Sequence, residues 1–392
     1  MEGSLDDLKS VYDHQVERWR EAPASAGRSV ERTANFGIRE MLPSFNDARV
    51  RGMDFPLAWR HAKTSFDDWR CAARAAYLKS LGERPSPAPF NMAVTGSEDR
   101  GTYVAQKIAL NLSPEERVKA YLLVPKGDGP FPGIIALHDH GAHFSIGKEK
   151  VIQPFAESEE RLQDAQKWVD SCYGGKYIGD ELAKRGYVVF ATDALYWGDR
   201  GRFGGVNYED QQALASNMSL LGLEWSGKIA WDDVRSAEFV QGLSCVDPDR
   251  IGCLGLSMGS HRTWSLAAAT DIVKAGAAIC WMGDTPTLTA PGNNQTKGYS
   301  AFSMLVPGLR GMLDYCDVAS IACPKPMLFF NGLKDGLFPV PGVEAAYAKM
   351  RRVWDSQGVS DRLITKLWDV PHEFNQDMQT EAFAWIDAQL KQ

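Results

Sequence analysis

The chain has 392 residues, is 44% hydrophobic and carries a net charge of −7, from 43 basic and 50 acidic residues. It is long enough to bury a full core and to carry additions to it. Its charges are mixed, with no basic run that could follow a phosphate backbone or an anionic lipid surface, and no window reaches the roughly 18 apolar residues that a membrane helix needs. We therefore expect neither nucleic acid nor a membrane as a partner.

The start of the chain and its cysteines predict a cytoplasmic protein. Glu2, Asp6 and Asp7 occupy the region where a signal peptide would be basic. The seven cysteines are odd in number, widely spaced and free of any CxxC pair, a pattern typical of a reducing compartment.

Residues 1–90 are predicted to be mainly helical. Apolar residues three or four positions apart give one helix face, formed by Phe66, Trp69, Ala73, Tyr77 and Leu81. The proline-rich stretch 82–89 interrupts this pattern and predicts a boundary near residue 90. We expect residues 1–90 to cap the active site or to form an interface, for example in a homodimer, and residues 91–392 to form the catalytic domain.

From residue 102 onward, short apolar runs alternate with helical segments, which predicts an α/β fold with a mostly parallel sheet flanked by helices. Strands are expected at 103–110, 118–124, 133–137, 187–192, 250–255, 275–281, 327–331 and 364–368. Three long insertions, near 141–177, 196–222 and 284–322, leave the carboxyl ends of strands. Ligands bind at those ends in α/β proteins, so we expect cover or binding loops there.

The sequence Gly255-Leu256-Ser257-Met258-Gly259 matches the G-x-S-x-G pattern of a nucleophile elbow. An apolar strand precedes it and a helix-compatible segment follows it, as such an elbow requires. The glycines remove side chains that would collide with the neighbouring strand and helix, and the serine is exposed on a strained turn. Ser257 is therefore the predicted nucleophile.

A serine nucleophile needs a histidine to take its proton and a carboxylate to orient that histidine. His372 follows the last predicted strand and precedes the final helix, so it is the predicted base. Asp335 leaves the strand at 327–331 and completes the order Ser, Asp, His. Asp284, after the preceding strand, is the alternative acid.

Acyl transfer also requires two backbone N–H groups that stabilise the oxyanion. Met258 is one predicted donor, and His140 or Gly141, in the loop after the first central strand, is the other. That loop also contains His138 and His143. With His140 they give the spacing H-x-H-x-x-H, which leaves a metal-dependent hydrolase as a second hypothesis.

With these residues placed, the chain resembles the dienelactone hydrolase and acetyl xylan esterase-like branch of the α/β-hydrolases, over about residues 100–390. The resemblance rests on AYLLVPKGDGPFP from Ala120, HDHGAH, GLSMGS, NGLKDG and VPHEF. It implies the α/β-hydrolase fold, the triad Ser257, Asp335 and His372, cleavage of small carboxylic esters, and no cofactor or metal.

The chain departs from that family at its elbow. Gly259-Ser260 replaces a double glycine, and a serine stands where dienelactone hydrolases have cysteine. Some relatives with a helical N-terminal segment cleave carbon–carbon bonds with the same triad, so C–C or amide hydrolysis is the alternative to ester hydrolysis.

Several residues beside Ser257 in the predicted fold could form a small, mostly apolar pocket. These candidate pocket residues are His138, Tyr196, Trp197, Trp281 and Phe338.

Overall fold

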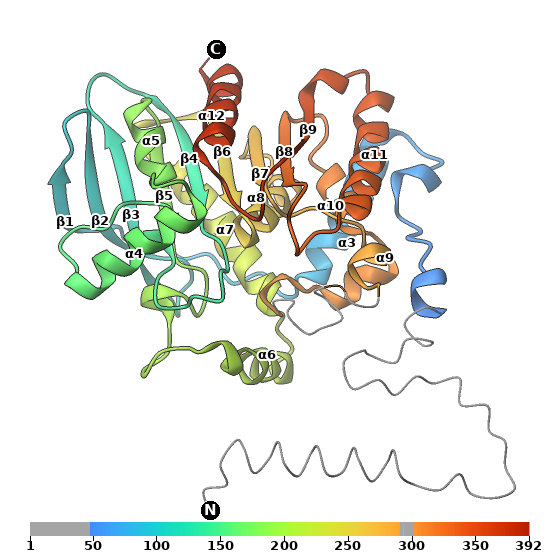
Figure 1. The fold of residues 1–392 in the computed structure, drawn as a ribbon, viewed down its shortest axis with the longest axis horizontal. Helices are drawn as coiled ribbons and strands as arrows, with labels where there is room; N and C mark the ends of the chain where they lie inside the picture. The colour runs from blue at the N-terminus through green and yellow to red at the C-terminus, as the bar shows by residue number, and fades with distance from the viewer. Residues whose placement is uncertain (1–47, 291–292, 294–301, 392) are drawn as a thin grey trace, which may run out of the picture.

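The computed structural model describes residues 48–290, 293 and 302–391. In this part of the chain, nine strands form one sheet in the order β1-β2-β3-β5-β4-β6-β7-β8-β9 (Figure 1). The strands are β1 (Ala93–Asp99), β2 (Tyr103–Asn111), β3 (Arg117–Pro125), β4 (Phe131–Leu137), β5 (Val188–Thr192), β6 (Val246–Leu256), β7 (Ala275–Ile279), β8 (Met327–Gly332) and β9 (Leu363–Trp368).

The sheet is antiparallel at one edge and parallel in the rest. The pairs β1/β2, β2/β3 and β3/β5 are antiparallel, and every pair from β5/β4 to β8/β9 is parallel. This confirms the predicted mostly parallel sheet. It also brings the loops that follow β4, β6, β7, β8 and β9 to one edge of the sheet, where a ligand can be reached from several loops at once.

Helices cover both faces of the sheet. The helices are α3 (Phe66–Ser80), α4 (Glu159–Cys172), α5 (Ile178–Lys184), α6 (Gln211–Leu220), α7 (Trp225–Gln241), α8 (Met258–Ala269), α9 (Thr285–Leu288), α10 (Tyr315–Ser320), α11 (Val340–Ser356) and α12 (Gln376–Leu390). Apolar residues of α3, α7, α8, α10 and α11 pack in one core, and those of α4, α5 and α12 pack in the other. No helix in the described part of the chain is long and apolar enough to span a bilayer.

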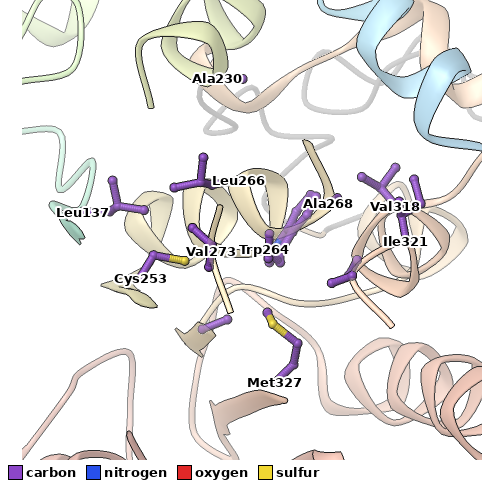
Figure 2. Close-up of a cluster of buried hydrophobic side chains, with 14 of the residues drawn as sticks. Leu137, Ala230, Cys253, Trp264, Leu266, Ala268, Val273, Val318, Ile321 and Met327 are labelled. Atoms are coloured by element: carbon purple, nitrogen blue, oxygen red, sulfur yellow. The ribbon is translucent and has the colours of Figure 1, made fainter. Parts of the chain in front are cut away.

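The core that contains α3, α7, α8, α10 and α11 centres on α8, which is buried from Met258 to Ala268. Trp264, Leu266 and Ala268 from α8 meet Cys253 of β6 and Met327 of β8 in Figure 2. A helix buried on all sides needs small and apolar residues rather than one charged face. The buried position of α8 fixes the start of that helix, directly after Ser257.

Helix α3 shows where the described part of the N-terminal segment lies. Ser65 caps this helix by accepting a hydrogen bond from the Asp68 N–H at 3.2 Å. Trp69, Ala73 and Tyr77, on the predicted apolar face, are buried in the same core as α8 and α10. The core therefore extends across the predicted boundary near residue 90. The expected helices before residue 48 lie outside the described residues.

Candidate active site

Ser257 lies in a strained turn between β6 and α8. Its backbone has φ 57° and ψ −120°, in the region that side chains other than glycine rarely adopt. The Ser257 N–H donates to the Ile279 carbonyl at 2.8 Å, which fixes the turn against the end of β7. A strained residue held in this way is typical of functional positions.

The two glycines of the elbow are required by close backbone contacts. A Cβ at Gly255 would lie 2.5 Å from the carbonyl carbon of Gly259, and a Cβ at Gly259 would lie 1.9 Å from the Leu137 carbonyl oxygen. Any side chain at either position would therefore collide with backbone. The contact with Leu137 also presses the elbow against the start of the loop that follows β4.

The loops after β8 and β9 bring Asp335 and His372 together. His372 Nδ1 lies 2.6 Å from Asp335 Oδ2, and the other carboxylate oxygen accepts the Leu337 N–H at 2.9 Å. A Cβ at Gly332 would lie 2.4 Å from the Val370 carbonyl oxygen, so this glycine allows the two loops to touch. The Asp335 side chain is fully buried, whereas that of His372 is 24% exposed.

Asp284, the alternative acid, has a different set of partners. Its Oδ1 caps α9 by accepting the Thr287 N–H at 3.1 Å, and its Oδ2 lies 3.4 Å from Lys349 Nζ. Its carboxylate is thus occupied by a helix cap and an ion pair, while His372 is in contact with Asp335. The geometry favours Asp335 over Asp284 as the acid.

Cys280 is a neighbour of the site that the sequence pattern did not reveal. The pattern places it inside a buried strand, but β7 ends at Ile279, and Cys280 follows with a positive φ of 57°. Its sulfur lies within 4.8 Å of ligand atoms of Asp335 and His372. Burial, with the nearby Asp335 carboxylate, raises the pKa of this thiol, so it stays protonated at neutral pH.

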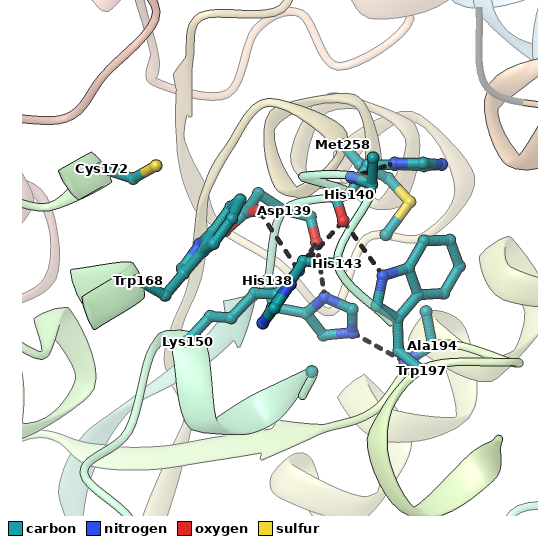
Figure 3. Close-up of polar contacts among 12 residues, drawn as sticks. His138, Asp139, His140, His143, Lys150, Trp168, Cys172, Ala194, Trp197 and Met258 are labelled. Carbon is teal, nitrogen blue, oxygen red and sulfur yellow. Dashed lines mark hydrogen bonds and ion pairs between the residues drawn. The ribbon is translucent and has the colours of Figure 1, made fainter. Parts of the chain in front are cut away.

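The predicted oxyanion donors lie at two adjoining backbone segments. Met258 is fully buried and is the first residue of α8, where backbone N–H groups have no partner within the helix. Gly141 has φ 61°, and a Cβ there would lie 2.2 Å from the Trp168 ring, so only glycine fits. Figure 3 shows the His140 segment beside Met258.

The three histidines of the loop after β4 do not share a site. His138 Nε2 accepts the Ala194 N–H at 2.9 Å, and His140 lies 2.9 Å from Gln211 Oε1. His143 lies 2.7 Å from Asp164 instead. Burial lowers the pKa of His138 well below its usual value and that of His140 to about 4, so both stay neutral.

The three rings have separate polar partners and are not brought together as a group of metal ligands. Among the described residues, the group of three possible ligand side chains that lie within 4.8 Å of one another is Cys280, Asp335 and His372. Two of these three are the predicted triad acid and base, and none belongs to the H-x-H-x-x-H segment.

A buried ion network lies beneath this loop, around Lys148. Lys148 Nζ contacts Asp193 Oδ2 at 2.8 Å, Asp199 Oδ2 at 2.7 Å and Glu149 Oε1 at 2.9 Å. Burial alone disfavours the ammonium, but the three carboxylates outweigh it and hold the pKa of Lys148 well above its usual value. The network fixes the segment after β5 to the segment after β4.

The candidate pocket residues are mostly buried packing residues. His138, Trp197 and Trp281 are at most 2% exposed. Phe338 is 4% exposed, and its ring lies 6.0 Å from that of His372 at an interplanar angle of 22°. Tyr196 is partly buried and packs edge-on against Trp225. Of these five side chains, Phe338 stacks on the base His372, and Trp281 packs against Phe338.

Comparison with known proteins shows which family and which fold this chain resembles. Residues 172–301, which include the elbow, match the dienelactone hydrolase family. A provisionally assigned acetyl xylan esterase from Bacteroides fragilis superposes with a TM-score of 0.67 at 18% identity, covering 84% of this chain and 83% of that one. The chain has the α/β-hydrolase fold.

A second solved structure and a curated sequence relative are also similar to this chain. A glucuronoyl esterase from Solibacter usitatus superposes with a TM-score of 0.59 at 14% identity, covering 83% of this chain and 94% of that one. The provisionally assigned hydrolase YtaP of Bacillus subtilis (strain 168) is 28% identical over 293 residues, which are 74% of this chain and 90% of that protein.

Proposed function

We propose that the protein is a serine carboxylic ester hydrolase, with Ser257 as nucleophile, His372 as general base and Asp335 as the acid that orients the histidine. The observation that carries this proposal is the strained backbone of Ser257, at the same sheet edge as the 2.6 Å contact between His372 and Asp335. The family match over the elbow and the esterase names of the structural neighbours support ester hydrolysis.

In the acylation step, Ser257 Oγ attacks the ester carbonyl while His372 Nε2 takes its proton. Asp335 accepts the Nδ1 proton of His372, so the proton that His372 gains from Ser257 is held on Nε2, facing the leaving group. The N–H groups of Met258 and of His140 or Gly141 stabilise the oxyanion. When the tetrahedral intermediate collapses, His372 donates its proton to the alcohol, and an acyl-serine remains.

In the deacylation step, His372 takes a proton from water as the water attacks the acyl-serine. The second tetrahedral intermediate releases the carboxylic acid and returns the proton to Ser257. The partial exposure of His372 fits this role, because water must reach the base in this half of the reaction.

The substrates proposed are esters of small or aromatic, mostly apolar groups. The aromatic residues behind the site, including Trp281 and Phe338, give its surroundings this character. The neighbours named as acetyl xylan and glucuronoyl esterases add sugar esters with a small acyl group or a uronate to the substrates worth testing.

The proposal is tested by hydrolysis of a p-nitrophenyl ester series, from acetate to benzoate, by the purified protein and by Ser257→Ala. We expect kcat to fall by roughly 10⁴- to 10⁶-fold in the variant, because the nucleophile is lost. Cys280→Ser is the matched control, since it alters a neighbouring nucleophilic atom, and we expect it to keep activity within a few-fold.

Two additional arms separate the alternatives. A p-nitroanilide and a 1,3-diketone, assayed in parallel, report amide and C–C bond cleavage by the same triad. A chelator arm reports metal dependence. Equal activity in wild type and Ser257→Ala, abolished by the chelator, would contradict the serine mechanism.

A further inference from the structure

Every polar atom of the His140 side chain has a partner. Nδ1 accepts the Ala142 N–H at 2.9 Å, and Nε2 lies 2.9 Å from Gln211 Oε1. Because Nδ1 accepts, the single proton of the neutral ring must be on Nε2 and is donated to Gln211. Burial lowers the pKa of the ring to about 4, so this neutral tautomer persists at neutral pH.

The carbonyl group of His140 is also fixed from two sides. Trp197 Nε1 donates to it at 3.1 Å and Lys150 Nζ at 3.0 Å. One residue further along the insertion, the Gly198 N–H donates to the Phe144 carbonyl at 2.9 Å. Figure 3 shows the indole of Trp197 directed at this loop.

The insertion at residues 196–222 therefore makes three hydrogen bonds to the oxyanion loop, which is the loop after β4 at residues 138–144. Gln211 bonds to the ring of His140, Trp197 to its carbonyl, and Gly198 to Phe144. Gln211 is the first residue of α6 and is only 4% exposed. Its carboxamide is oriented by donating to the Tyr208 carbonyl at 3.1 Å, which leaves Oε1 to accept from His140.

The position of this loop matters because an oxyanion donor acts only at hydrogen-bond distance from the developing charge. The loop starts against the elbow, where a Cβ on Gly259 would already meet Leu137. Among the described residues, neither the His140 N–H nor the Gly141 N–H donates a hydrogen bond. The peptide unit between His140 and Gly141 is planar, so fixing the His140 carbonyl fixes the direction of the Gly141 N–H, one of the two predicted donors in this loop.

We propose that Gln211 is a positioning residue for ester hydrolysis. Its carboxamide holds His140 in the Nε2–H tautomer, and His140 Nδ1 in turn holds the Ala142 N–H, so α6 sets the shape of the oxyanion loop. This inference rests on the proposed function. It gives the insertion at 196–222 a role in transition-state stabilisation.

The first test compares Gln211→Leu, which removes the acceptor, with Gln212→Leu, an exposed neighbour on the same helix. With p-nitrophenyl acetate we expect Gln211→Leu to lower kcat by about 10-fold and to leave KM within about 2-fold, less than the roughly 10²- to 10³-fold loss on deleting an oxyanion donor. Gln212→Leu should match wild type. Equal kcat values in the two variants would overturn the inference.

Gln211→Glu supplies a rescue with a pH signature. The carboxylate still accepts from Nε2–H but no longer donates to the Tyr208 carbonyl, so we expect kcat near neutral pH to recover part of the loss. It also raises the pKa of His140, beside which the charges of Lys150 and Asp139 lie 3.4 Å apart and partly offset each other. Protonation of Nδ1 breaks the contact with Ala142, so this variant should lose kcat on the acid side at higher pH than wild type.

Hydrogen exchange supplies a readout that does not depend on hydrolysis. Amide exchange of peptides covering residues 138–144 should become faster in Gln211→Leu and stay unchanged in Gln212→Leu. If wild type hydrolyses no ester, the proposed function fails, and the exchange rates alone decide whether Gln211 holds the loop. If wild type hydrolyses esters and exchange is the same in both variants, the positioning role is wrong.

Discussion

The two sides of the site are built differently. On the side of β4 and β5, buried ions and neutral histidines hold the oxyanion loop through many contacts, and Lys148 alone contacts three carboxylates. On the side of β8 and β9, His372 has Asp335 as its polar partner and is 24% exposed. An oxyanion donor has to stay fixed, which the many buried contacts of its loop provide. A general base has to exchange protons with substrate and water, which the partial exposure of His372 allows.

The largest effect is expected on the side of β8 and β9, from replacing the proposed acid Asp335. Asp335→Asn keeps the shape of the side chain but no longer favours the required tautomer of His372, so we expect kcat to fall by about 10⁴-fold. Asp284→Asn is the matched control. Asparagine still caps α9, so kcat should stay within a few-fold. Steady-state kinetics on one ester measures kcat for both variants. A larger loss of kcat in Asp284→Asn than in Asp335→Asn would identify Asp284 as the acid.

The side of β4 and β5 is tested by removing the charge of Lys148. Lys148→Met leaves three carboxylates without their shared partner in a buried site, so we expect the free energy of unfolding to fall by about 3–5 kcal/mol. Lys119→Met is the control, because Lys119 also contacts Asp199, at 3.4 Å, but is 69% exposed. We expect this substitution to lower the free energy of unfolding by less than about 1 kcal/mol. Urea unfolding measures both. Similar losses would show that the network is not the stabilising feature described here.

A smaller effect is expected from the pH dependence of stability. Burial lowers the pKa of His261 to about 3, among the rings of Trp264, Trp281 and Tyr315. Between that value and its unfolded pKa of about 6.5, only the unfolded chain binds the proton, so stability falls by up to about 1.4 kcal/mol per unit as the pH decreases.

His261→Phe removes this contribution while keeping an aromatic ring in the cluster. The difference in unfolding free energy between the variant and wild type should therefore shift in favour of the variant between about pH 6.5 and pH 4. Using the difference cancels carboxyl groups that act in the opposite direction, such as Asp317, whose pKa burial raises to about 6. Parallel stability curves would show that His261 is not buried in its neutral form.

The sequence predicts those parts of the molecule that depend on local pattern. The elbow is recognisable because its glycines, its preceding strand and its following helix are contiguous. The loop positions of Asp335 and His372 follow from strand order. Helix α3 follows from the spacing of Trp69, Ala73 and Tyr77, although the pattern does not show that this face joins the main core.

Features made by distant or polar residues are not predictable in this way. Strand β1 is almost entirely exposed and has no apolar alternation, so the pattern gives no signal for it. The contacts of Lys148 with Asp193 and of His140 with Gln211 join residues 45 and 71 positions apart. Cys280, like Cys253, lies in a run of apolar residues in the sequence. It lies beside the acid and the base because the chain turns directly after β7, which the sequence pattern does not show.

The central claim, that Ser257 is the nucleophile, is tested most directly by covalent labelling with a fluorophosphonate and peptide mass spectrometry. We predict one adduct per chain on the peptide containing Ser257, with loss of fluoride and of esterase activity in parallel. The adduct should be absent in Ser257→Ala and present in Cys280→Ser. An active enzyme that is labelled at another residue, or that stays fully active and unlabelled, would contradict the account.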